Sequence, residues 1–138
     1  MSKAFTGGCA CGANRYEIPS EPISEIHCQC RDCQQMSGTG HGSYLAFLQR
    51  ADVKLKGDAT HWDIVADSGN VKTRAFCPLC GSPVYMTFAA APDVFVVHAG
   101  SLDEPGRFNP QKVLYKVRNH PWDTHDPALP KFEGMPPR

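Results

Sequence analysis

Seven cysteines fall into three short groups, and they are the residues most able to do chemistry in this chain of 138 residues. The groups read Cys9-Ala10-Cys11, Cys28-Gln29-Cys30-Arg31-Asp32-Cys33 and Cys77-Pro78-Leu79-Cys80. Zinc takes four ligands in a tetrahedron and is held by thiolates at about 2.3 Å. A CxxC turn brings two sulfurs to one side of a tight loop, and a CxC pair does so where its backbone is extended. The grouping therefore favours metal binding.

The simplest division of the seven thiols is four plus three. Cys9, Cys11, Cys77 and Cys80 would close one tetrahedron and staple the N-terminal strand to a distant hairpin, which is a structural role. The remaining cysteines are Cys28, Cys30 and Cys33. Three protein ligands with an open fourth position are the layout of a catalytic zinc site. Water or an incoming thiolate would fill that position.

Other uses of the middle group stay open at this point. A histidine could close it as a structural site, and the candidates are His27, His41, His61 and His98. Of these, His27 would point to the opposite face of an extended strand from Cys28. The three thiols could instead be metal-free and redox-active. Cys9 and Cys11 could also share a site with the middle group, but this would leave Cys77 and Cys80 without partners.

Composition narrows the class of protein. Lys and Arg number 14 and Asp and Glu number 14, so the net charge is zero, which argues against a nonspecific nucleic-acid binder. Hydrophobic residues make up 41% and charged residues 20%, as in globular domains. There is no apolar stretch of the roughly 18 residues that span a membrane. The first residues lack an apolar signal core, so we expect a cytoplasmic protein whose thiols stay reduced, rather than a disulfide scaffold.

The elements that must position these groups are short strands. Glycine and proline are spread through the chain between short apolar runs, a pattern typical of a mainly β single domain. We predict strands at Arg15–Ile18, Ile23–His27, Ser43–Gln49, Val53–Lys56, Thr60–Val65, Val71–Phe76, Val84–Phe88 and Val94–His98. Ser68-Gly69-Asn70 predicts a hairpin turn.

One helical turn and a tail complete the expected organisation. We expect the turn at Arg31–Ser37, ending at Gly38. The domain would occupy residues 1–125, and residues 126–138 would form a proline-rich tail that lies extended or frayed.

Two further sets of residues have expected roles. Within the middle group, Asp32 would cap the start of the helical turn or, with Arg31, orient a bound ligand. The strand pattern places a set of aromatic residues in the core, namely Trp62, Phe76, Tyr85, Phe88 and Phe95.

The order of these motifs resembles a known family. The matching segments are Gly7–Tyr16, His27–Gly38, Phe76–Tyr85 and Ala99–Asp103, and all seven cysteines fall within them. The chain is similar over most of its length, from Gly7 to about Trp122, to the glutathione-dependent formaldehyde-activating enzymes, also called centromere protein V-like proteins.

This resemblance implies a β-tent-type fold of short antiparallel strands with two zinc ions. It implies that Cys9, Cys11, Cys77 and Cys80 hold a structural zinc, and that Cys28, Cys30 and Cys33 hold a labile second zinc and carry the catalysis. The implied activity joins a small thiol such as glutathione to formaldehyde, the reverse of a carbon–sulfur lyase reaction. No nucleic-acid or membrane partner is expected. The alternatives are a carbon–sulfur enzyme for another thiol adduct and a non-catalytic zinc-binding module for protein or nucleic-acid contacts.

Overall fold

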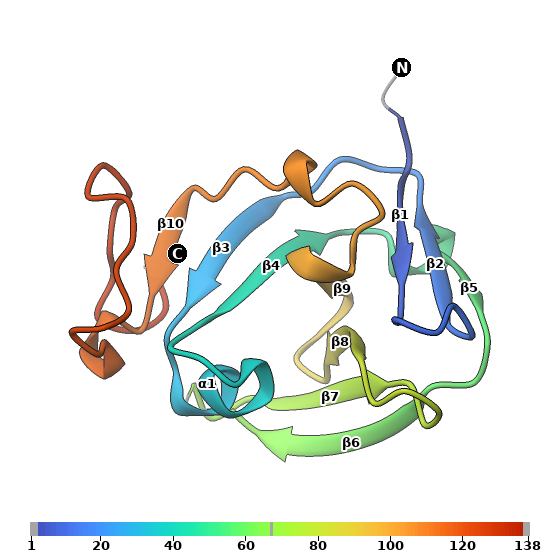
Figure 1. The fold of residues 1–138 in the computed structure, drawn as a ribbon, viewed down its shortest axis with the longest axis horizontal. Coiled ribbons are helices and arrows are strands. Elements are labelled where there is room, and N and C mark those ends of the chain that lie inside the picture. Colours follow the sequence, from blue (N-terminus) through green and yellow to red (C-terminus); the bar gives the residue numbers. More distant parts are fainter. Residues whose placement is uncertain (1–2, 67, 137–138) are drawn as a thin grey trace.

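The computed structural model describes residues 3–66 and 68–136, and its strands form two sheets (Figure 1). The smaller sheet has three strands in the order β1-β2-β5, with antiparallel pairing throughout. Its members are β1 (Phe5–Gly8), β2 (Arg15–Ile18) and β5 (Lys54–Lys56). The mainly β prediction is confirmed.

The larger sheet has seven strands in the order β10-β3-β4-β9-β8-β7-β6. Its pairs are antiparallel except for β10 and β3, which run parallel. The strands are β3 (Ser24–Cys28), β4 (Gly42–Phe47), β6 (Thr60–Val65), β7 (Val71–Phe76), β8 (Pro83–Phe88), β9 (Ala91–His98) and β10 (Lys112–Leu114). All eight strands expected from the sequence are present, some with bounds shifted by one to three residues, whereas β1 and β10 were not expected.

Only one α-helix occurs in the described ranges, α1 (Arg31–Ser37), with the bounds expected from the sequence. Cys30 caps its start by accepting from the Cys33 amide, and Gly38 ends it in the left-handed conformation at φ 76°. Short 3₁₀ turns lie at Arg50–Asp52, Ala99–Ser101, Pro105–Arg107 and Lys116–Arg118. No described helix has the length and apolar character needed to cross a membrane.

Successive side chains on a strand alternate between faces, and both faces of the larger sheet carry buried residues in its central strands, whereas the edge strand β6 is mostly exposed. One face packs towards the smaller sheet and carries Leu45, Phe47 and Val97 in a core that also contains Phe5 and Ile18. The opposite face carries a second cluster, whose buried members are Cys28, Cys30, Cys33, Tyr44, Met86, Val96 and Leu114. The second face is therefore the one that bears the middle group of cysteines.

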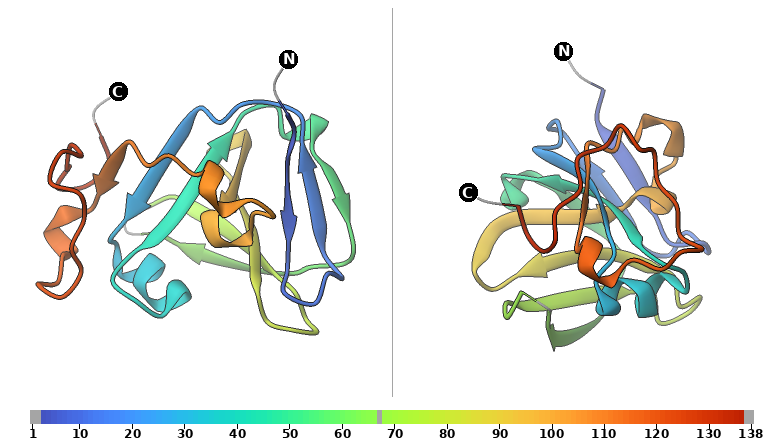
Figure 2. Two further views of the ribbon diagram at one scale, coloured as in Figure 1. Left: turned by 45° about the horizontal axis from the view of Figure 1, so that its top comes forward. Right: turned by 90° about the vertical axis from the view of Figure 1, so that its left-hand side faces the viewer.

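The C-terminal segment is extended and paired rather than frayed. It runs along β10, where Val113 donates to the Pro130 carbonyl at 2.9 Å and Phe132 donates to the Val113 carbonyl at 2.9 Å. Figure 2 shows this segment beside β10, at the end of the larger sheet away from β1 and β2. These hydrogen bonds cover a sheet edge that would otherwise be open.

Candidate functional site

The first and third cysteine groups meet at one end of the molecule, between two hairpin turns. Their four sulfurs all lie within 4.8 Å of one another. The Cys9 and Cys11 sulfurs are 3.6 Å apart, and those of Cys11 and Cys77 are 3.7 Å apart. A tetrahedron with zinc–sulfur bonds of about 2.3 Å has sulfur–sulfur edges of about 3.8 Å, so this geometry fits a zinc ion.

The local backbone explains how these sulfurs converge. Gly81 donates to the Cys77 carbonyl at 2.8 Å, which closes the expected CxxC turn, and Gly81 has a φ of 77°. The backbone of the CxC pair is not extended. It lies in the turn between β1 and β2, where Gly12 at φ 81° donates to the Cys9 carbonyl at 3.2 Å. Positive φ angles at these positions suit glycine.

Cys80 and Cys11 of this cluster differ in acidity. Hydrogen bonding from the Ser82 side chain and from backbone groups lowers the pKa of Cys80 to about 5. The Ala13 backbone favours the Cys11 thiolate, but the neighbouring thiols and burial together raise the pKa of Cys11 to about 11. Four adjacent negative charges repel one another, so full ionisation of the cluster requires a cation. The donor set therefore fits a metal electrostatically as well as geometrically.

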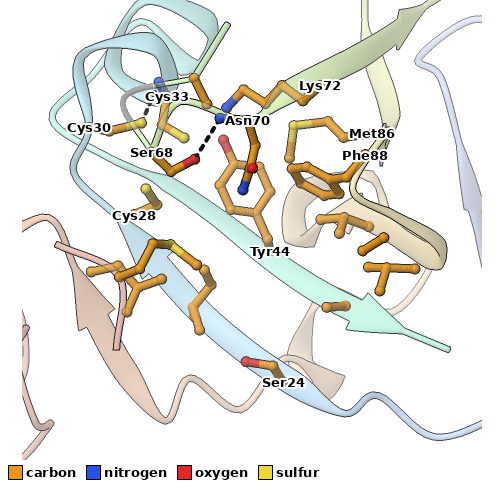
Figure 3. A pocket seen from close by; sticks show the side chains of 18 of the residues that line it. Ser24, Cys28, Cys30, Cys33, Tyr44, Ser68, Asn70, Lys72, Met86 and Phe88 are labelled. Atoms are coloured by element: carbon orange, nitrogen blue, oxygen red, sulfur yellow. Dashed lines mark hydrogen bonds between the residues drawn. The ribbon is translucent and has the colours of Figure 1, made fainter. Parts of the chain in front are cut away.

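The middle group gathers at the end of β3 and the start of α1. Cys28 is the last residue of β3, Cys30 caps the helix and Cys33 lies in its first turn. All three are buried, and their sulfurs lie within 4.8 Å of one another. Figure 3 shows the three sulfurs at one end of a cavity of about 320 Å³, with Tyr44 between them and Met86 and Phe88.

This three-cysteine cluster contains no histidine among the residues that the structure describes. His27 lies on the other face of β3, as expected, because it is adjacent to Cys28 on a strand. His98 lies against the Tyr44 ring at 5.0 Å between ring centroids, and His61 pairs with the Tyr85 hydroxyl at 3.0 Å. His41 pairs with Asp123 at 2.8 Å. A three-cysteine site closed by histidine is therefore not what the structure contains.

The cluster holds its negative charge unevenly. Hydrogen bonds from Cys28 and Cys30 lower the pKa of Cys33 to about 3 despite burial, and the cation of Lys72 acts in the same direction. The pKa of Cys28 is raised well above its ordinary value, mainly by its neighbours Cys30 and Cys33. The Cys33 thiolate thus accepts hydrogen bonds from the thiols of Cys28 and Cys30. It presents a sulfur-rich, electron-rich surface to the cavity.

Two features beside the sulfurs were not anticipated from the sequence, and the first is Tyr44. The Tyr44 hydroxyl is buried and has no hydrogen-bond partner among the described residues. Burial, followed by the charge of Cys33, raises the pKa of Tyr44 well above its ordinary value, so the phenol stays protonated. A side chain at Gly42 would come within 2.1 Å of the Tyr44 hydroxyl, so glycine there makes room for it. The protonated Tyr44 phenol therefore lies on the wall of the cavity, beside the Cys33 sulfur.

The second is a buried ion cluster behind the helix. Asp32 accepts from Lys72 Nζ at 2.5 Å and also pairs with Arg74, and both cations are almost fully buried. Asp32 therefore does not cap α1, where Cys30 is the cap, and its ion pairs tie α1 to β7. Two cations balanced by one carboxylate leave a net charge of 2 − 1 = +1, which favours a thiolate at Cys33.

The chain is similar to known proteins over most of its length. A family model described as glutathione-dependent formaldehyde-activating enzyme matches residues 4–118. Curated protein sequences give no significant match. Among solved structures, a Rhodobacter sphaeroides structural-genomics target aligns with a TM-score of 0.57 and 16% identity, covering 92% of this chain and 98% of that one. At this identity, the structural likeness extends to the fold alone.

Proposed function

This chain belongs to the glutathione-dependent formaldehyde-activating enzyme family, and from that premise we propose that it joins a small thiol, glutathione in the first instance, to formaldehyde. The observation that carries the proposal is the cavity at the three-cysteine cluster. Cys28, Cys30 and Cys33 line it together with Tyr44 and Lys72. The four-cysteine cluster does not line that cavity, which supports its assignment to a structural role.

Each cysteine cluster is proposed to hold one zinc ion. Cys9, Cys11, Cys77 and Cys80 form a complete set of four ligands and would join two hairpins. Cys28, Cys30 and Cys33 would leave one ligand position open for the thiol of the substrate. A bound zinc ion would stabilise the thiolate form of that substrate at neutral pH. A reducing compartment such as the cytoplasm would keep all these thiols available.

The side chains of the cavity supply the rest of the reaction. The substrate sulfur attacks the carbonyl carbon, a carbon–sulfur bond forms, and the π electron pair moves to the oxygen. We assign Tyr44 as the donor that protonates this oxygen, and the proton released by the thiol restores the phenol. The positive charge of Lys72 stabilises the developing oxyanion. Run backwards, the same steps make the protein a carbon–sulfur lyase.

Binding and turnover together test this proposal. Reduced glutathione should bind the zinc-loaded protein by calorimetry, and S-methylglutathione, which lacks a free thiol, should not. The enzyme should also accelerate exchange between free formaldehyde and the adduct, measured by NMR because the uncatalysed reaction occurs as well. Equal binding of both compounds, or exchange at the uncatalysed rate, would contradict the proposal.

The cavity wall favours a second candidate. Beyond the sulfurs, Lys72 and Lys112, most of the lining is apolar, with Ile26, Ala46, Met86, Phe88, Val94, Val96 and Leu114. Such a wall suits an apolar group better than the charged backbone of a peptide. The second candidate is therefore the same chemistry on a more apolar thiol or aldehyde. Faster turnover of an aromatic aldehyde than of formaldehyde would favour it.

A further inference from the structure

A second kind of cluster lies behind the three cysteines, on the other face of the larger sheet. It combines His27 of β3, His41 of the loop before β4 and His125 of the C-terminal segment. Candidate ligand nitrogens of the three rings all lie within 4.8 Å of one another. The ring centroids are separated by 4.4 to 4.9 Å. Three residues distant in sequence thus converge on one point.

Each ring has one nitrogen fixed by a polar neighbour. His27 Nδ1 lies 2.8 Å from the Ser43 hydroxyl, and His41 Nδ1 lies 2.8 Å from Asp123 Oδ1. His125 Nε2 lies 3.1 Å from the other oxygen of Asp123. Among the described residues, these rings have no hydrogen bond at their second nitrogen. Metal-binding histidines have this arrangement, in which one nitrogen binds the ion and the other contacts a carboxylate or hydroxyl.

The carboxylate that holds two of the rings is itself held in place. Asp123 is buried and accepts from Gln29 Nε2 at 3.1 Å. A side chain at Gly40 would come within 2.5 Å of Asp123, so this glycine lets the loop close over the carboxylate. The Asp123 carboxylate is therefore held in one orientation, unlike the carboxylate of an exposed ion pair.

The cluster is also reachable from solvent. The His125 side chain is only 5% exposed, whereas that of His41 is 24% exposed. His41 and Ser43 line a second cavity of about 560 Å³, which is distinct from the one at the three cysteines. An ion could therefore reach His41 through this second cavity, which Cys9 of the four-cysteine cluster also lines.

We propose that His27, His41 and His125 bind a zinc ion through three imidazole nitrogens, with Asp123 as the positioning residue for two of the rings. Three histidines with a free fourth position form a known catalytic zinc arrangement. Imidazole also suits cobalt and nickel, so cobalt can act as a probe. The site is a third metal site, independent of the two cysteine clusters and of the proposed thiol chemistry.

Cobalt added to the protein with zinc retained in its cysteine clusters tests the site. Wild-type protein should take up one further ion per chain and show ligand-field bands without sulfur-to-metal charge transfer. His41→Gln should weaken cobalt binding by at least about 100-fold, and Asp123→Asn by about 10- to 100-fold. His61→Gln is the matched control, because His61 lies on β6 and contacts Tyr85 instead of this cluster. It should bind cobalt like the wild type.

A second measurement needs no substitution, so its result does not depend on how a variant folds. Nitrogen NMR of the wild-type imidazoles during zinc addition should shift the signals of His27, His41 and His125, and leave His61 unmoved. Uptake of no further ion would overturn the proposal, as would equal cobalt binding by His41→Gln and the wild type. Unshifted imidazole signals at saturating zinc would also overturn it, and would leave the three rings as a packing contact around Asp123.

Discussion

Replacing Asp32 with asparagine tests the buried ion cluster that joins α1 to β7. In the wild type, the Asp32 side chain is 16% exposed and faces Lys72, 5% exposed, and Arg74, 1% exposed. Asparagine keeps the shape but removes the negative charge, so that Lys72 and Arg74 lose the carboxylate that pairs with both of them. Breaking a buried pair in this way costs about 3–5 kcal/mol. For a domain of this size, that corresponds to a fall in Tm of about 10–15 °C.

The matched control is Asp103→Asn. Asp103 pairs with Arg15 at 2.5 Å, but these side chains are 43% and 38% exposed. Water screens such a pair, so the expected cost is below about 1 kcal/mol. Circular dichroism during thermal and urea unfolding measures both variants, with zinc content determined on the same samples. If Asp32→Asn melted within about 3 °C of the wild type, the argument from buried charge would be refuted.

Three further predictions address the sites. Cys30→Ser should lose one zinc ion per chain and keep the folded spectrum, because the four-cysteine cluster remains complete; loss of the fold would contradict the four-plus-three division. Tyr44→Phe should lower kcat by about 10²–10³-fold with unchanged zinc content, as measured for removal of an oxyanion donor elsewhere; Tyr85→Phe, which alters a phenol outside the cavity, is the control. The pKa of His98 is lowered to about 4 by burial and by Arg74 and Lys72, from 6.5 in the unfolded chain. At His98 the unfolded chain thus binds more protons between these values, so the contribution of His98 to stability should be fully present above about pH 6.5 and fall by about 2 kcal/mol between pH 7 and pH 5. Urea unfolding at the two pH values checks this, and a His98→Gln variant that kept the same difference would refute the assignment.

The sequence predicts the cysteine clusters better than their surroundings. Spacing within a cluster is local information, and so is the signal for α1, which begins at a capping residue and ends at Gly38. Tyr44 and Lys72 carry no local signal, because they reach the sulfurs only through the order and register of β4 and β7 in the sheet. The histidine cluster depends on the path of the C-terminal segment, which brings His125 to His27.

The wrong prediction for Trp62 and the missed strand β1 also arise because the arrangement of strands in the sheets is not local information. Trp62 was expected in the core, but β6 is an edge strand and its tryptophan is 58% exposed. Period-two patterning places a residue on a face and does not say whether that face is covered. Similarly, β1 reads Phe5-Thr6-Gly7-Gly8, and its two glycines give little strand propensity. Its position is set by pairing with β2 and by a close approach of Gly7 to Tyr16 and Ser101.

The four-cysteine cluster has a consequence for the protein during its synthesis. Cys11 and Cys77 are separated by 66 residues, whereas Cys30 and Cys33 are three residues apart. At about 5–20 residues per second, a ribosome needs roughly 3–13 seconds to make the chain between Cys11 and Cys77. Throughout that interval the N-terminal pair is present without its partners, whereas the middle group is complete after about the first third of it, once Cys33 has been added. Metal loading on the nascent chain should therefore begin at the three-cysteine cluster and end at the four-cysteine cluster.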